Sequence, residues 1–261
     1  MPSTSTPGKA ARLLELHRAP AILTLVNVWD VASARVVAGM PGIQALATAS
    51  HSIAASLGYE DGEHIPVAEM IAAVGRIVAA TDLPVTADLE AGYGDPPETI
   101  RKAIGVGAVG ANLEDQMKPL ADAVAAVEAA VRAASAEGVD DFVLNARTDA
   151  FLLAGDRDPA AVLEDAVARG RAFLEAGAAV VFVPGRLDET QVTTLVDALG
   201  RQRLSLLSMP GALSVARMEE LGVARVSFGP WSHRAALTAL RHLTGRALRG
   251  SGVPDGIEPL T

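Results

Sequence analysis

The sequence predicts an α/β protein built as one (β/α)8 TIM barrel. Short runs rich in Val, Leu and Ile alternate with Ala-rich segments of helical length, and no change in composition marks a second domain. Eight such alternations within 261 residues match the size of a single barrel, so we expect one domain over residues 1–261. A doubly wound open sheet is the alternative, but no GxGxxG turn follows the first strand, which disfavours it.

Apolar runs bounded by Gly, Pro or polar residues predict the eight strands. We expect them at Ile22–Asn27, Ala45–Thr48, Val85–Asp88, Ala111–Glu114, Phe142–Arg147, Val180–Pro184, Leu204–Ser208 and Arg225–Phe228.

Segments with helical spacing lie between the strands, and several begin with Asp or Pro and stop at Gly, as helix ends commonly do. We expect helices at Val31–Ala38, Val67–Ala80, Glu98–Val106, Ala121–Glu137, Ala160–Ala176, Glu189–Leu199, Ala212–Leu221 and Trp231–Leu248. Residues 1–10, rich in Ser, Thr and Pro, predict a flexible N-terminal arm, and the Gly- and Pro-rich residues 249–261 predict a C-terminal tail.

The composition excludes several classes of function. A net charge of −9 argues against nucleic acid or an anionic membrane as a partner, while a small carboxylate needs only a local cation. The chain has no Cys, which rules out a thiolate nucleophile and a Cys-type zinc site. With no apolar run long enough to cross a bilayer and no signal-peptide pattern, we expect a cytoplasmic protein.

Charged residues gather where the third, fourth and fifth strands end, the end of such a barrel that carries the chemistry. Asp88 and Glu90 stand at alternate positions, so an extended chain would direct both to one side. Neighbouring carboxylates repel each other unless a cation or a proton lies between them. Asp88, Glu90 and Glu114 form a hard-oxygen set suited to Mg²⁺ or Mn²⁺.

Arg147, at the end of the fifth strand, can bind an anionic oxygen through two parallel hydrogen bonds. A metal ion together with an arginine would stabilise an oxyanion that develops during a reaction. The simpler alternative is that Arg147 only neutralises Glu114 in a salt bridge at the barrel rim.

Several motifs, in the same order, resemble the isocitrate lyase/phosphoenolpyruvate mutase superfamily from about Leu25 to Leu240. They are NVWDVASAR (27–35), SHSIAASLGYEDGE (50–63), ADLEAGYG (87–94), GANLEDQ (110–116), NARTDAF (145–151) and VFVPG (181–185). The resemblance implies a barrel that forms a homotetramer or homodimer, often with its last helix swapped between neighbours. It also implies a Mg²⁺ ion held by the acidic motif, partly through water, and chelated by a 2-oxo acid or its enolate.

The resemblance also assigns roles to individual residues. Backbone N–H groups at Ser50 and His51 would bind the substrate carboxylate, and Asp61 falls near the metal. Arg147 falls on the arginine that binds the enolate and carboxylate oxygens. Independently of the resemblance, Asn145 stands two residues before Arg147 and is expected either to bind the substrate or to orient that arginine. Tyr93, beside the acidic motif, is a candidate proton donor, with packing over the strand end as its alternative.

The chain departs from the superfamily pattern in ways that bear on the reaction. The lyases carry a mobile loop with a catalytic Cys after the EDQ motif, whereas here only Met117–Asp122 follows before a helix. Glu90 replaces the usual Asp, and Pro184 stands where the mutases have His. A site without a lid tolerates irreversible cleavage best, because solvent can protonate the enolate.

We therefore expect a C–C bond-cleaving enzyme, a decarboxylase or lyase, acting on a small 2-oxo or 2-hydroxy acid such as oxaloacetate or a substituted malate. Two alternatives remain open: hydrolysis or mutation of a phosphonate such as phosphonopyruvate, and binding of a 2-oxo acid without turnover.

Overall fold

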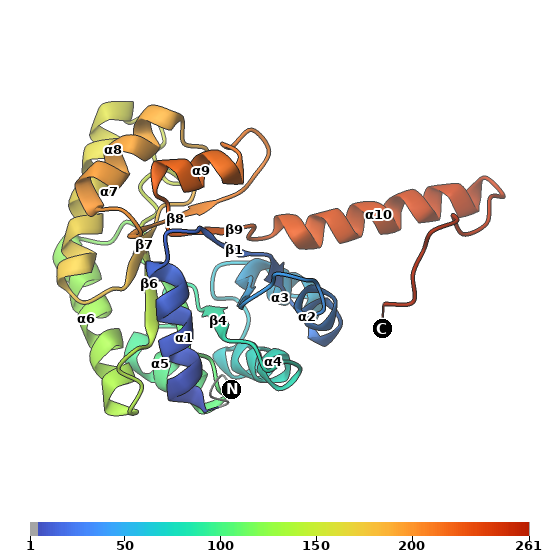
Figure 1. The fold of residues 1–261 in the computed structure, drawn as a ribbon, viewed down its shortest axis with the longest axis horizontal. Helices are drawn as coiled ribbons and strands as arrows, with labels where there is room; N and C mark the ends of the chain where they lie inside the picture. Colours follow the sequence, from blue (N-terminus) through green and yellow to red (C-terminus); the bar gives the residue numbers. More distant parts are fainter. Residues whose placement is uncertain (1–4, 261) are drawn as a thin grey trace.

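The computed structural model describes residues 5–260, which form a ring of parallel strands surrounded by helices (Figure 1). The strands are β1 (Leu23–Leu25), β2 (Asn27–Val28), β3 (Leu46–Thr48), β4 (Val85–Asp88), β5 (Gly110–Glu114), β6 (Val143–Arg147), β7 (Val180–Phe182), β8 (Leu204–Leu207) and β9 (Arg225–Ser227). The helices are α1 (Thr6–Arg18), α2 (Val31–Ala38), α3 (Ser50–Leu57), α4 (Val67–Ala79), α5 (Pro96–Gly105), α6 (Leu120–Ala136), α7 (Pro159–Glu175), α8 (Glu189–Leu199), α9 (Val215–Leu221) and α10 (Trp231–Leu248).

The barrel closes through its first strand, which is interrupted at Val26. The first half, β1, pairs with β9, and the second half, β2, pairs with β3, so the sheet runs β1-β9-β8-β7-β6-β5-β4-β3-β2 with every pair parallel. β1 and β2 together occupy one barrel position. The predicted (β/α)8 fold is confirmed.

Local sequence signals explain where the helices begin. The Asp30 carboxylate accepts a hydrogen bond from the Ser33 N–H at 2.7 Å and forms a capping box at the start of α2. Asp158 accepts from the N–H groups of Ala160 and Ala161 and is followed by Pro159, so α7 starts there. These caps determine the residues at which α2 and α7 begin.

Two helices were not expected from the sequence. The predicted flexible arm over residues 1–10 is wrong from Thr6 onward, because α1 begins there and buries Ala10 and Leu13; residues 1–4 lie outside the described part of the chain. Leu13 packs against Gly110 at the start of β5, so α1 covers the end of the barrel where the strands begin. The second helix, α3, begins at Ser50, directly after β3.

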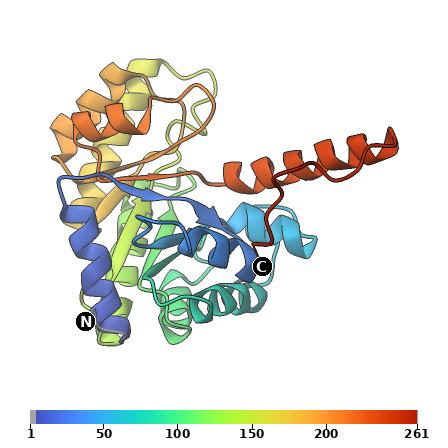
Figure 2. The same cartoon turned by 45° about the vertical axis from the view of Figure 1, so that its right-hand side comes forward.

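The last helix, α10, projects away from the barrel in both views (Figures 1 and 2). It buries only His233, while Leu237, Leu240 and Leu248 are 49%, 58% and 85% exposed. Residues 251–260 follow it without helix or strand. Among the helices of residues 5–260, none is both long enough and apolar enough to span a membrane.

Candidate active site

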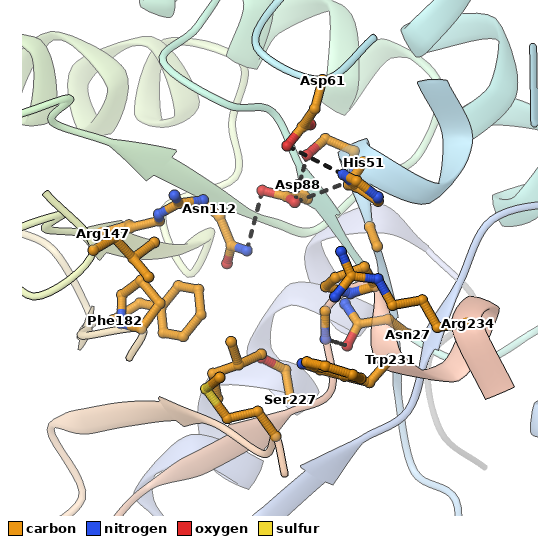
Figure 3. A pocket seen from close by; sticks show the side chains of 18 residues that line it. Asn27, His51, Asp61, Asp88, Asn112, Arg147, Phe182, Ser227, Trp231 and Arg234 are labelled. Atoms are coloured by element: carbon orange, nitrogen blue, oxygen red, sulfur yellow. Dashed lines mark hydrogen bonds and ion pairs between the residues drawn. The ribbon is translucent and has the colours of Figure 1, made fainter. Parts of the chain in front are cut away.

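A cavity of about 290 Å³ opens at the carboxyl ends of the barrel strands (Figure 3). Its walls combine acids, amides and two arginines with apolar side chains such as Phe182 and Pro184. This is the end of the barrel at which the sequence placed the chemistry. The polar side chains lining it are Asn27, Ser50, His51, Asp61, Asp88, Asn112, Arg147, Ser227 and Arg234.

Asp88, the last residue of β4, is held in this cavity by three donors. Its Oδ2 accepts hydrogen bonds from the Ser50 N–H at 3.1 Å and the Ser50 hydroxyl at 2.8 Å, and its Oδ1 accepts from the Asn112 amide at 3.3 Å. Ser50 begins α3, so the carboxylate also lies at the positive end of a helix dipole. A carboxylate offers about four acceptor positions, so the site keeps one direction open for a ligand. The Ser50 N–H, expected on the substrate carboxylate, binds Asp88 in this structure.

Glu90 lies behind the cavity rather than in its wall. Its carboxylate accepts hydrogen bonds from the Tyr93 hydroxyl at 2.8 Å and from the Glu63 N–H. The residue has a φ of 53° and is 3% exposed. Burial raises its pKa, and the nearby charges of Asp88 and Asp61 act in the same direction. Tyr93 therefore directs its hydroxyl to Glu90, and neither residue lines the cavity.

Arg147, at the end of β6, reaches the cavity wall while holding two acids. Its Nη1 lies 2.7 Å from Glu114 and its Nε lies 2.7 Å from Asp149. Glu114 does not line the main cavity but a smaller one of about 40 Å³. Burial raises the pKa of Glu114, and the charge of Arg147 opposes that shift. The salt-bridge alternative for Arg147 and Glu114 is thus present, and the same guanidinium still faces the cavity.

Two other expected residues, Asp61 and His51, meet at the cavity rim. The Asp61 carboxylate lies 3.4 Å from the His51 Nδ1, and both side chains are more than a third exposed, so the pair is weak (Figure 3). Asn145 lies elsewhere: it is fully buried beneath the cavity floor and donates to Asn112 at 2.7 Å. It does not line the cavity.

The expected metal ligands do not form a ready chelate. Within residues 5–260, no three His, Asp or Glu side chains converge closely enough to hold an ion by themselves. Asp88 and Asp61 nevertheless share the cavity wall, and the charges of Asp88 and Glu90 both raise the pKa of Glu114, as expected for carboxylates that lie near one another. Mg²⁺ retains several waters and needs only one or two carboxylates, so this donor set fits a hydrated ion.

Three residues that line the cavity, Asn27, Asn112 and Arg234, were not expected as site residues. Asn27 joins three strands, because its Oδ1 accepts from the N–H groups of Phe228 and Gly229 and its amide donates to the Thr48 carbonyl. Asn112 stands two residues before Glu114, so strand alternation could have identified it. Arg234 stacks 4.7 Å from the Trp231 ring at the start of α10, and no pattern in the sequence indicated it.

The expected short connection after β5 is confirmed. Only residues 115–119 separate β5 from α6, and Asp115 fixes them. Its carboxylate accepts from the N–H groups of Met117 and Asp149 and pairs with the buried Arg169 at 3.1 Å. The turn is therefore tied to β6 and α7, and the connection from β5 to α6 is too short to close over the cavity.

Fold and site together define an α/β-barrel enzyme with an acidic, arginine-containing pocket at the ends of its strands. The chain belongs to the phosphoenolpyruvate phosphomutase family, whose model matches residues 13–248. The family lies within the isocitrate lyase/phosphoenolpyruvate mutase superfamily, and its members among the relatives are lyases and mutases. The chain is accordingly an enzyme of the lyase type.

Three relatives illustrate the similarity. Oxaloacetate decarboxylase of Paraburkholderia xenovorans (strain LB400) is 29% identical, over 89% of this chain and 86% of its own length. A structure from Burkholderia cenocepacia J2315, provisionally assigned as a phosphonomutase, has a TM-score of 0.86 and 40% identity over 93% of this chain and all of the other. Oxaloacetate acetylhydrolase with the product oxalate has a TM-score of 0.84 and 27% identity over 97% and 91% of the two chains.

Proposed function

We propose that this enzyme is a Mg²⁺- or Mn²⁺-dependent carbon–carbon lyase for a small 2-oxo or 2-hydroxy di- or tricarboxylate, with oxaloacetate as the first candidate. The observation that carries the proposal is the shared cavity of Asp88 and Arg147, an acid able to bind a cation and a cation able to bind an oxyanion. The similarity to oxaloacetate decarboxylase and to an oxalate-binding acetylhydrolase supports a small dianionic ligand.

Each side chain then has a defined task. Asp88 and Asp61 would hold the ion, with Glu90 and Glu114 adding negative charge behind them. When bound, the ion supplies a Lewis acid for the 2-oxo oxygen. Arg147 remains fixed by Glu114 and Asp149, so its other N–H groups would bind the oxyanion without rearrangement of the side chain.

The carbon balance of the favoured reaction is simple. The C3–C4 bond of oxaloacetate breaks, CO₂ leaves, and the electron pair stays on the pyruvate enolate whose oxygen faces Arg147. A proton on C3 then completes pyruvate. The fixed turn at residues 115–119 leaves the cavity open, so water can deliver this proton and no side chain need act as the donor.

Pyruvate formation from oxaloacetate tests the proposal. We expect the wild-type enzyme with Mg²⁺ to exceed the rate of Mg²⁺ alone, and to fall to the spontaneous metal-free rate when the metal is chelated. Asp88→Asn should lose at least 100-fold in kcat/KM, because the amide keeps the shape but binds a divalent ion poorly. A wild-type rate equal to that of Mg²⁺ alone, for oxaloacetate and for substituted malates, would refute it.

Phosphonate chemistry is the second candidate, because the matching family model is that of a phosphomutase and one similar structure carries a provisional phosphonomutase assignment. Release of phosphate from phosphonopyruvate, or its conversion to phosphoenolpyruvate, would select it. A third outcome is tight binding of oxalate with no turnover of any of these acids, which would identify a 2-oxo acid-binding protein.

A further inference from the structure

The barrel interior beneath the cavity is polar, although barrels usually fill this space with Val, Ile and Leu. Asn112 of β5 lies in register with Asn145 of β6, and Ser205 of β8 lies in register with Arg225 of β9. All four side chains are 5% exposed or less. Amides and a guanidinium thus replace apolar side chains directly under Asp88.

The hydrogen bonds of Asn112 determine which end of its side-chain amide is the oxygen and which is the NH₂ group. Its Oδ1 accepts from the Asn145 amide at 2.7 Å and from the Arg225 Nη2 at 3.4 Å. Both partners are donors at these contacts, and only an oxygen can face two donors. The NH₂ group of Asn112 is therefore directed upward, where it donates to the Asp88 Oδ1 at 3.3 Å (Figure 3).

Arg225 is a costly residue to hold in this place. It is 1% exposed, and within residues 5–260 its Nε and Nη1 have no hydrogen-bond partner; the charge of Asp88 favours its charged form from a distance. Burial lowers its pKa to about 10, so the side chain still carries its charge at neutral pH. A buried cation without a counter-ion in direct contact destabilises a fold, and such violations are expected where function requires them.

We propose that Arg225 is a positioning residue of the candidate site, which acts through Asn112 to hold Asp88 ready for the metal ion and the substrate. The chain of contacts runs from the guanidinium to the Asn112 oxygen, and from the Asn112 amide to the carboxylate. Without Arg225, Asn145 alone would orient Asn112. The inference rests on the proposed function, since it gives Asp88 a ligand to bind.

Arg225→Met separates this role from a structural one. Methionine fills most of the same volume without the charge, so we expect the melting temperature to stay level or rise. Binding of oxalate in the presence of Mg²⁺, measured by calorimetry, should weaken about tenfold, the usual effect of one lost hydrogen bond to a charged group. Arg225→Lys keeps the charge but has fewer donors, so its affinity for oxalate should lie between those of the wild type and Arg225→Met.

A double-mutant cycle shows whether the effect passes through Asn112. Asn112→Leu should weaken oxalate binding by a similar factor, and adding Arg225→Met to it should weaken binding no further. Thr86→Val is the matched control: Thr86 is equally buried in the interior, its hydroxyl has no partner among the described residues, and it touches neither Asn112 nor Arg225 in any hydrogen bond. It should leave oxalate binding unchanged.

Additive losses in the cycle, or a folded Arg225→Met variant that binds oxalate as tightly as the wild type, would overturn the proposal. A readout independent of turnover is the side-chain amide of Asn112 in ¹⁵N NMR spectra. Its protons should exchange slowly in the wild type and faster in Arg225→Met. This difference in exchange rate does not depend on turnover, so it would be seen even if the enzyme cleaved no 2-oxo acid. Rapid exchange in the wild type would refute the positioning role of Arg225 without affecting the proposed function.

Discussion

The Arg147 guanidinium has to meet two requirements. It must be held rigidly enough to bind an oxyanion, and it must still face the cavity. Glu114 and Asp149 take one N–H group each at 2.7 Å, which fixes the plane of the group. Lysine keeps the charge but cannot make both contacts at once. Arg147→Lys should therefore lower kcat/KM for oxaloacetate by about 100-fold, equivalent to roughly 3 kcal/mol of transition-state binding.

Steady-state rates with oxaloacetate check this expectation, with the melting temperature as the control for folding. A lysine variant that retains more than a tenth of the wild-type kcat/KM would show that the fixed plane of the guanidinium is unimportant.

The burial of His17 in α1 leads us to expect that the free energy of unfolding depends on pH. Its side chain is 2% exposed, and burial together with the charge of Arg225 lowers its pKa to about 3. The unfolded chain binds the proton near pH 6.5, so the stabilising contribution is complete above that pH and is lost as the pH falls toward 3. Between pH 7.5 and 5.5 the loss from this group should be about 1.4 kcal/mol.

Urea unfolding of the wild type and of His17→Phe at the two pH values measures this effect. The variant should lose about 1.4 kcal/mol less than the wild type over that interval, whatever its stability at pH 7.5. Equal losses in both proteins would show that His17 is not buried in its neutral form.

At the level of single elements, the short turn after β5 depends on one buried ion pair. Arg169 of α7 holds both the Asp115 carboxylate at 3.1 Å and the Lys118 carbonyl at 3.0 Å. Arg169→Met would leave Asp115 buried without its counter-charge and should cost about 3 kcal/mol of unfolding free energy. Denaturant unfolding checks the value, and a loss below 1 kcal/mol would show that the turn does not depend on this pair.

Strand ends were well predicted because a polar residue follows an apolar run there, as at Asp88, Glu114 and Arg147. Glu90 departs from the expected alternation for a physical reason. β4 ends at Asp88, and the left-handed φ of Glu90 turns its side chain out of the strand pattern toward Tyr93. The i, i+2 rule holds only while the chain remains extended.

The helix α1 was predictable in principle and was missed. Its buried residues, Ala10, Leu13, Leu16 and His17, recur at helical spacing, but the Pro and Gly at its start favoured a loop. The capture of the Ser50 N–H by Asp88 was not predictable, because it depends on how closely α3 approaches β4 in space. The burial of Asn145 and Arg225 inside the barrel was likewise not predictable, because it depends on how neighbouring strands are paired and not on the composition of the sequence.

At the level of the whole molecule, α10 carries apolar side chains beyond its first turn that nothing within residues 5–260 buries. Leu237 and Leu240 are exposed on it, and only its first turn contacts the cavity through Trp231 and Arg234. We propose that a second copy of this chain covers the helix, as the resemblance to helix-swapping relatives implied, giving a homodimer or homotetramer.

Light scattering of the wild type and of Leu237→Asp/Leu240→Asp tests the assembly. The wild type should have a multiple of the 26.8 kDa chain mass, and the double variant should shift to the monomer, because two buried carboxylates would oppose the contact. A monomeric wild type would refute the proposed assembly and leave the catalytic proposal untouched.

A divalent ion beside Asp88 and opposite Arg147 is the feature on which the proposed chemistry depends. Crystals grown with Mn²⁺ and oxalate, measured at the manganese absorption edge, test it most directly. We expect an anomalous peak roughly 2.1 Å from an Asp88 oxygen, with oxalate between the ion and the Arg147 guanidinium. Oxalate bound in the cavity with no ion beside Asp88, or an ion bound only at other residues, would contradict it.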